Sequence, residues 1–478
     1  MTSALSWRPA QLQGVASAAV VTCAAVALGG LVGFDERIAF GAVGALALAA
    51  CCFLKPTAGL LCWMPAVFVP ASAIGGALWR AGFLLSVAAW AFDAIRRRSI
   101  TDERLREFRW LLALIVAMFL WFGATMLWAS DTTAAFQEYR WWPIPLAYFV
   151  LLLTRITATR HVLLVAGAFV ASATLAAVTG LVVLRSTASA SANSLTSLDN
   201  RVSGGAGDPN YLGAGLVAAV ILAFGLACAV RRVWLRSATV VAILVMAVAA
   251  AGTASRMVPI SAGVALVAAL VIFRHVIGRV LAASVCVILP AGLWFFCFPP
   301  AWERIKASGD GGNGREDLWA AAIHLAQENP IVGVGVANFQ VRKPAVALQI
   351  GEVKNSSVLA EQPLVAHNTY LQLWADTGVI GLVLFLAIAV FCIWCFPRAA
   401  REFVAAGRRD LAVLSRTAAV AAVSMLGSAA FITIPRDLRL WLLLALGPIL
   451  LSLARAGTQR FRGHQVESMP VTESCPAS

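Results

Sequence analysis

Two arginines stand where a fixed positive charge could bind a phosphate. Arg256 ends a Gly-Thr-Ala-Ser-Arg stretch between two apolar runs, and Arg315 opens a helix predicted over 315–327. A guanidinium binds phosphate through a bidentate fork, so two of them converging on one point would neutralise a departing pyrophosphate. The alternatives are that Arg256 extends to the membrane interface, and that Arg315 is a surface arginine stacked on Trp319.

His367 is the candidate general base. It is one of five histidines and stands directly before an apolar run, next to Asn368. An imidazole titrates near neutrality and can accept the proton of a hydroxyl. The alternative is a histidine at a helix start that bonds only to the backbone. No second histidine or carboxylate follows at ligand spacing, so we expect neither a metal nor a cofactor.

Five further residues are predicted to bind substrate. Asp208 and Asn210 belong to a Gly-Asp-Pro-Asn-Tyr turn that leads into a helix and would shape the site. Arg201 is an additional candidate ligand for the pyrophosphate or for phosphates of the acceptor. Trp319 lies one helical turn after the second arginine, on the same face, and Asn368 follows the histidine.

Two glycines, Gly333 and Gly335, follow Pro330 and precede Phe339. Their spacing permits a turn with positive φ or a close backbone approach. A phosphate-binding loop is the weaker interpretation, because no Lys-Ser/Thr pair follows. We therefore expect these glycines to serve the fold.

The composition is that of a membrane protein. Of 478 residues, 60% are hydrophobic and 13% are charged, against about 25% in a soluble domain. Apolar runs close to the length of a membrane-spanning helix recur along the chain, which predicts an all-α, polytopic transmembrane bundle. The net charge of +14 resides in short loops and does not indicate nucleic acid. The ten cysteines lie mostly inside apolar runs and show no metal-binding or disulfide spacing.

The apolar runs number fourteen, of which two could be re-entrant or interfacial, so we expect 12 or 14 spans. They cover 14–34, 37–54, 58–76, 79–95, 110–129, 141–154, 162–184, 211–230, 237–252, 257–273, 280–298, 377–397, 411–433 and 437–454. The resulting organisation is 1–298 membrane helices, 299–376 a large loop carrying the chemistry, 377–455 membrane helices and 456–478 a disordered tail.

Arginine-rich loops alternate with arginine-poor ones, which predicts the orientation. The arginine-rich loops would be cytoplasmic by the positive-inside rule, as would both termini. The loops at 130–140, 185–210, 253–256, 299–376 and 434–436 would then face the other side of a bacterial inner membrane. All candidate catalytic residues fall in or beside these loops.

In order, these motifs resemble the O-antigen ligase/polymerase superfamily of polytopic membrane glycosyltransferases. The resemblance covers about 208–384 and runs as Thr-x-Ser-Arg, Arg-x-x-x-Trp, Pro-hydrophobic-x-Gly-x-Gly-x-x-x-Phe and His-Asn-x-x-Leu, followed by a span with Gly378 and Gly381. It implies an enzyme that takes a glycan from undecaprenyl pyrophosphate in the periplasm. Transfer would invert the anomeric centre without a metal, with His367 as base and Arg256 and Arg315 on the pyrophosphate.

Within the superfamily the acceptor differs. Ligases use the lipid A–core oligosaccharide, polymerases another carrier-linked repeat, and protein O-glycosyltransferases a Ser or Thr side chain. We expect a ligase, because one long loop carries the whole constellation, and because only a short tail follows Ala454 where the protein glycosylating group usually has a further domain. The expected partners are the lipid-linked donor, the lipid A–core acceptor and membrane lipid, but no nucleic acid. A secondary transporter and a non-catalytic assembly role are the competing classes.

Overall fold

The computed structural model describes residues 36–68, 73–96, 103–190, 201–204, 207–297, 314–347 and 364–467. The predicted run 14–34 lies outside these ranges. So do Arg97 and Arg98, which belong to the arginine-rich loop that was predicted to be cytoplasmic between the runs 79–95 and 110–129. Every regular element within them is a helix, and the prediction of an all-α polytopic bundle is confirmed.

Nine helices of the described ranges are long and apolar enough to cross a membrane. They are α4 (Ala73–Arg96), α6 (Arg109–Ala124, extended by a 3-10 turn), α9 (Thr159–Ala190), α10 (Pro209–Ala229), α11 (Val233–Gly252), α13 (Ile277–Cys297), α18 (Thr369–Ala405), α19 (Arg409–Ser428) and α20 (Leu438–Glu467).

Four predicted runs form helices that are not among these nine. They are α2 (Glu36–Leu54), α3 (Pro56–Trp63) continued by η1 (Met64–Phe68), α8 (Pro143–Arg155) and α12 (Met257–Ile272). The break between α2 and α3 falls at Lys55, because Pro56 is favourable only in the first turn of a helix.

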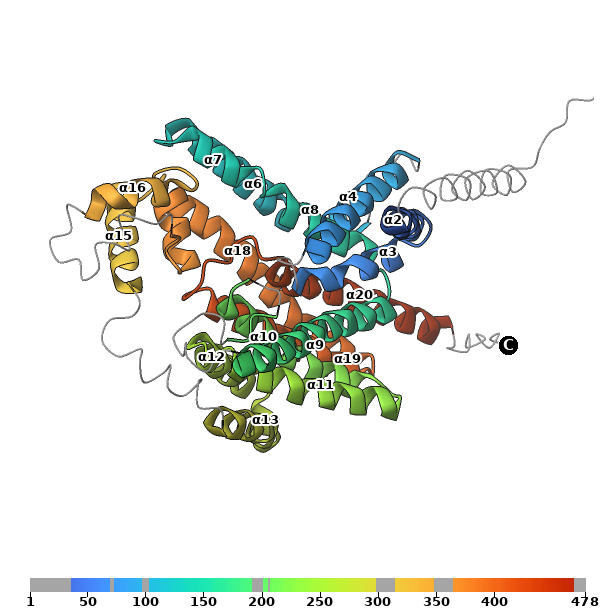
Figure 1. The fold of residues 1–478 in the computed structure, drawn as a ribbon. Coiled ribbons are helices and arrows are strands. Elements are labelled where there is room, and N and C mark those ends of the chain that lie inside the picture. Colours follow the sequence, from blue (N-terminus) through green and yellow to red (C-terminus); the bar gives the residue numbers. More distant parts are fainter. Residues whose placement is uncertain are drawn as a thin grey trace, which may run out of the picture.

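The centre of the bundle is formed by α10, α19 and α20. In α20, 78% of the most apolar window is buried inside the protein, whereas none of the corresponding window of α13 is buried. Figure 1 shows α13 at the edge of the molecule, while α9, α10 and α20 cross its middle. The exposed face of α13 is therefore available to lipid, and the buried central helices form the core that supports the loops.

The predicted large loop forms a small helical unit of its own. It contains α15 (Arg315–Glu328) and α16 (Asn338–Ala347), which lie beside the start of α18 (Figure 1). A separate apolar core, including Leu318, Leu325 and Phe339, holds them together. The prediction of a helix over 315–327 is confirmed to within one residue.

The helical unit is fastened to a break in α18. At Gly378 the backbone leaves the helical region, with φ 69° and ψ −175°. The freed groups are satisfied by the segment before α16: Val379 N donates to Pro330 O at 2.9 Å, and Gly335 N donates to Asp376 O at 2.8 Å. A side chain at Gly378 would place Cβ 2.0 Å from Ile331 O, so only glycine fits.

The structural interpretation of the other two glycines is confirmed. Gly333 and Gly335 have φ of 69° and 103°. A Cβ on Gly333 would lie 2.6 Å from the main-chain oxygen of Asp376, and one on Gly335 would lie 2.7 Å from Ala129 Cβ. Both glycines therefore serve the docking of the loop onto the membrane helices.

The arginine-poor loops meet at one end of the bundle. Arg201 bonds to Thr253 O, Tyr211 to Thr433 O, and Asp131 N to Asn338 Oδ1. At the opposite end, Arg155 pairs with Asp93 and Arg455 with Glu107. The two groups of loops are thus separated as predicted, whereas the side of the membrane that each faces remains a prediction.

The disordered tail from 456 stays a prediction, although a helix covers its first part. Helix α20 continues to Glu467, and the remainder, 468–478, lies outside the described residues. The reason is local: no proline occurs between Pro448 and Pro470, and the intervening arginines and glutamines favour a helix.

Candidate active site

Four residues of the predicted site are linked by pairwise electrostatic interactions. The charges of Asp208 and Arg256 both act on Arg315, and the charges of Arg315 and Asp208 both act on His367. These residues come from four separate segments of the chain. Arg315 thus interacts electrostatically with both Arg256 and His367, and Asp208 acts on Arg315 and His367; the catalytic roles stay predictions.

His367 has a strained backbone. Its φ is 48°, a left-handed conformation that is uncommon for residues other than glycine. Strain of this kind persists only where the surrounding structure enforces it, and it clusters at active sites. The neighbours of His367 on both sides supply that enforcement.

On the N-terminal side, a chain of hydrogen bonds fixes Ala366. Its N–H donates to Gln372 Oε1 at 2.8 Å, and Gln372 Nε2 donates to Asp376 Oδ2 at 2.7 Å. The other oxygen of Asp376 accepts from Phe339 N at 2.7 Å. The backbone before His367 is thus tied to α18 and, through Phe339, to the start of α16.

On the C-terminal side, Asn368 and Thr369 fix the start of α18. Asn368 is the N-cap, and its Oδ1 accepts from the N–H groups of Tyr370 and Leu371 at 3.0 and 3.1 Å. Thr369 Oγ1 donates to Ile432 O at 2.8 Å and accepts from Ile434 N at 2.9 Å. A structural role for Asn368 is therefore clear, and its substrate role stays a prediction.

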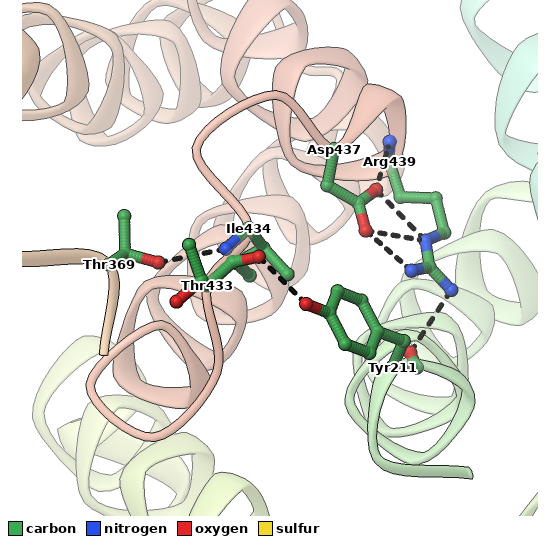
Figure 2. Close-up of polar contacts among 6 residues, drawn as sticks. All are labelled: Tyr211, Thr369, Thr433, Ile434, Asp437 and Arg439. Carbon is green, nitrogen blue, oxygen red and sulfur yellow. Dashed lines mark hydrogen bonds and ion pairs between the residues drawn. The ribbon is translucent and has the colours of Figure 1, made fainter. Parts of the chain in front are cut away.

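The α19–α20 loop, residues 429–437, joins the segments that carry the site. Figure 2 shows it between Thr369 and Tyr211, whose hydroxyl donates to Thr433 O at 2.9 Å. The Phe431 ring lies 5.8 Å from that of Trp319, centroid to centroid. The loop thus contacts the helices of Arg315 and Asp208 and the residue two positions after His367.

The imidazole of His367 is suited to a proton acceptor. Burial lowers the pKa of His367 below the usual imidazole range, Arg315 lowers it further, Asp208 raises it and Lys343 lowers it. The net direction favours the neutral ring near pH 7. Its Nδ1 is buried and has no hydrogen-bond partner among the described residues.

Arg315 opens α15 directly after Gly314, whose φ of 72° only glycine adopts readily. Burial lowers the pKa of Arg315, the carboxylate of Asp208 raises it, and the charge of Arg256 lowers it. A guanidinium nevertheless stays charged in proteins. Arg315 is partly desolvated whereas Arg256 is exposed. Two neighbouring cations that repel each other provide a site for a multiply charged anion.

Arg256 lies at the exposed end of a second strained turn. Ala254, two residues earlier, has φ 45°. Ser255 Oγ donates to Asn210 Oδ1 at 2.6 Å, and Arg201 Nη2 donates to the same oxygen at 3.2 Å. These bonds fix the Arg256 turn against the start of α10.

The remaining predicted residues have structural partners. Asp208 is the N-cap of α10 and accepts from Asn210 N at 2.6 Å. Arg201 Nε donates to Thr253 O at 2.7 Å. Trp319 packs on Phe431, and its indole N–H is buried without a partner among the described residues. Their substrate roles stay predictions.

Sequence reasoning missed several contributors. Lys343 of α16 is 1% exposed and acts on His367 by its charge. The Gln372–Asp376 pair and the α19–α20 loop were also not identified. Asp376 carried a signal, since a carboxylate at the start of an apolar run needs a partner. Lys343 carried none, because its burial arises from tertiary packing.

The arrangement offers a base and a concentration of positive charge. His367 can accept a proton, and Arg256 and Arg315 can stabilise a leaving anion. Within the described ranges, no three side chains of His, Cys, Asp and Glu gather in a potential metal site. Metal independence of the reaction remains a prediction.

Comparison with known families agrees with the motif order. Residues 241–386 match the family model described as O-Antigen ligase. The matched range contains Arg256, Arg315 and His367, whereas Asp208 and the α19–α20 loop lie outside it. No curated protein matches the chain.

Proposed function

We propose that the protein is an O-antigen ligase, because residues 241–386 match the family model described as O-Antigen ligase. It would transfer a glycan from undecaprenyl pyrophosphate to the lipid A–core oligosaccharide, on the periplasmic face of the bacterial inner membrane. The observation that carries the proposal is the convergence of Arg256, Arg315 and His367 at one end of a membrane bundle.

The proposed reaction is a single displacement at the anomeric carbon. The acceptor hydroxyl oxygen forms a bond to that carbon while the carbon–oxygen bond to the pyrophosphate breaks, which inverts the centre. His367 takes the hydroxyl proton, and the electron pair leaves with the pyrophosphate. Arg256 and Arg315 stabilise the departing charge, a task that a divalent ion performs elsewhere.

The geometry of α18 does not favour transport. A secondary transporter is expected to have broken helices with polar groups near the middle of the membrane. The break at Gly378 is filled instead by backbone of the segment around Pro330, which belongs to the helical unit outside the bundle. The polar groups at this break therefore have a structural explanation.

Lipopolysaccharide from a deletion strain tests the proposal. Loss of the ligase leaves core without O-antigen and accumulates polymer on the carrier lipid. Core with a single repeat would identify a polymerase instead, and unchanged lipopolysaccharide would reject both activities. The deletion strain is complemented with the intact gene or with the gene for His367→Ala. The intact gene should restore O-antigen on the core, and the variant should not.

A further inference from the structure

A hollow lies beside the candidate active site. It has a volume of about 290 Å³ and is enclosed by η1, α4, the start of α8, the start of α10 and residues 436–439. Tyr211, Ile144 and Trp79 form part of its wall. None of the predicted catalytic residues lines it, so it is distinct from the Arg256–Arg315–His367 constellation.

The hollow lies at the same end of the bundle as the active site. Ile144 belongs to the first turn of α8, Tyr211 to the first turn of α10, and Leu438 is the first residue of α20. Tyr211 connects the two places: its hydroxyl bonds to Thr433 O, and its carbonyl oxygen accepts from Arg439 (Figure 2). The hollow therefore neighbours the site across the α19–α20 loop.

The lining has the character of a lipid site at a membrane interface. Trp79, Trp141 and Tyr211 are residue types that concentrate at the level of lipid headgroups. Ile144 and Leu438 add aliphatic surface, which accommodates hydrocarbon. An arginine beside such a surface can bind a phosphate.

Arg436 is the better placed of the two arginines for that role. Arg439 is 6% exposed, and its guanidinium is engaged by Asp437 and by Tyr211 O. Arg436 has a side-chain exposure of 33%, and its contact with Glu138 uses Nη2. A guanidinium has five N–H donors, so the contact with Glu138 leaves donors for a phosphate.

We propose that this hollow binds the lipid end of the acceptor, an acylated glycolipid that carries phosphate. Arg436 contacts the phosphate, and the first carbons of an acyl chain lie against Ile144 and Leu438. The inference rests on the proposed function, which requires two lipid-linked substrates to meet. The donor's pyrophosphate occupies the Arg256–Arg315 side, and the acceptor anchor approaches from the other side of the α19–α20 loop.

Lipid binding to the full-length protein tests this inference. The purified protein is placed in phosphatidylcholine nanodiscs, and binding of added lipid A is measured by native mass spectrometry. Ile144→Trp fills the hollow, and Arg436→Gln removes the phosphate ligand. Each variant should weaken lipid A binding by about tenfold or more, as expected for losing a charge-assisted contact or the space itself.

Glu138→Gln is the matched control, because it breaks the ion pair and keeps Arg436. It should bind lipid A within about twofold of the unmodified protein, since the phosphate ligand is retained. An equal loss in Glu138→Gln and Arg436→Gln would show that the arginine acts only through its pair and would overturn the inference. Unchanged binding by Ile144→Trp would also overturn it.

Phosphatidylglycerol separates an acceptor site from a general site for anionic lipid. The inference predicts that lipid A binds more tightly than phosphatidylglycerol and that only lipid A responds to the two variants. Equal binding of both lipids would overturn it. Lipid A binding at the hollow without any glycan transfer would keep the hollow as a lipid site but reject the proposed function, and the acceptor role with it. Glycan transfer without such binding would overturn the inference and leave the proposed function standing.

Discussion

The hydroxyl of Tyr211 donates a 2.9 Å hydrogen bond to the main-chain oxygen of Thr433. This bond joins the first turn of α10, which follows Asp208, to the α19–α20 loop. The same loop holds Thr369, two residues after His367. The bonds of Tyr211 and Thr369 to this loop therefore help to set the separation between Asp208 and His367.

Removing that hydroxyl should impair transfer more than it impairs folding. Tyr211→Phe should lower stability by about 0.5–1.5 kcal/mol, the usual net value of one hydrogen bond. We expect the transfer rate to fall by about tenfold, because small displacements of reacting groups are costly. Thermal unfolding and initial rates on the purified protein measure the two effects.

Tyr139→Phe is the control, since Tyr139 also bonds to a backbone oxygen, that of Phe119, at 3.3 Å. It should show a similar or smaller change in stability and an unchanged rate. Equal losses of rate in both variants would mean that the Tyr211 bond has no particular link to the site.

A methyl group at the break in α18 should loosen the helical unit. Gly378→Ala requires a positive φ and meets Ile331 O, so it should destabilise the protein by more than about 1 kcal/mol. Gly263→Ala of α12 is the control, because nothing lies within 4 Å of its added Cβ. It should leave stability unchanged or raise it. Similar unfolding temperatures for the two variants would contradict the described packing of residues 330–339 on α18.

The parts of this fold that depend on local sequence could be predicted. Nine of the fourteen apolar runs correspond to described helices that are long and apolar enough to span a membrane. Helix α15 ends next to Asn329-Pro330 because a residue before proline disfavours helix. Gly333 and Gly335 could be assigned a structural role because no Lys-Ser/Thr pair, which a phosphate-binding loop requires, follows them. The motif order suggested that Arg256, Arg315 and His367 act together, and their joint role stays a prediction.

What could not be predicted depends on backbone contacts between distant segments. Thr369 is linked to Ile432 and Ile434 through main-chain atoms, which every residue type possesses. The left-handed φ of His367 results from its fixed neighbours rather than from its own preference. Lys343 is buried by the packing of α16, and periodicity over its ten residues does not reveal that.

The rate of glycan transfer should fall on the acid side, at a pH below the ordinary pKa of imidazole. A lowered pKa means that the neutral, proton-accepting ring persists to lower pH, so activity should fall only below about pH 6.5. Lys343→Met removes one charge that lowers the pKa of His367 and should move the acid limb to higher pH. A pH–rate profile of kcat/KM measures the shift.

Arg342→Met provides the comparison, because Arg342 is the neighbouring cation on α16 and pairs with Glu328. Its profile should match that of the unmodified protein. Identical shifts in the two variants would point to a change in the helix rather than to a charge acting on His367.

The two arginines should not be replaceable by lysine. Arg256→Lys and Arg315→Lys keep the charge and lose the bidentate fork, so each should reduce transfer on the order of 10²–10³-fold. Protein amount in the membrane must be measured alongside, and Arg342→Lys serves as the control. Near-normal transfer by both lysine variants would show that charge alone suffices and would reject the clamp.

The most direct measurement is transfer by the purified protein, with an undecaprenyl-pyrophosphate-linked glycan, lipid A–core and excess chelator. The unmodified protein should join the glycan to the core and release undecaprenyl pyrophosphate. His367→Ala and His367→Gln should both lose on the order of 10²–10⁴-fold in rate while still binding donor, because neither side chain can serve as the base. Substantial turnover by the glutamine variant with an unchanged pH profile, or strict dependence on a divalent metal, would contradict the account.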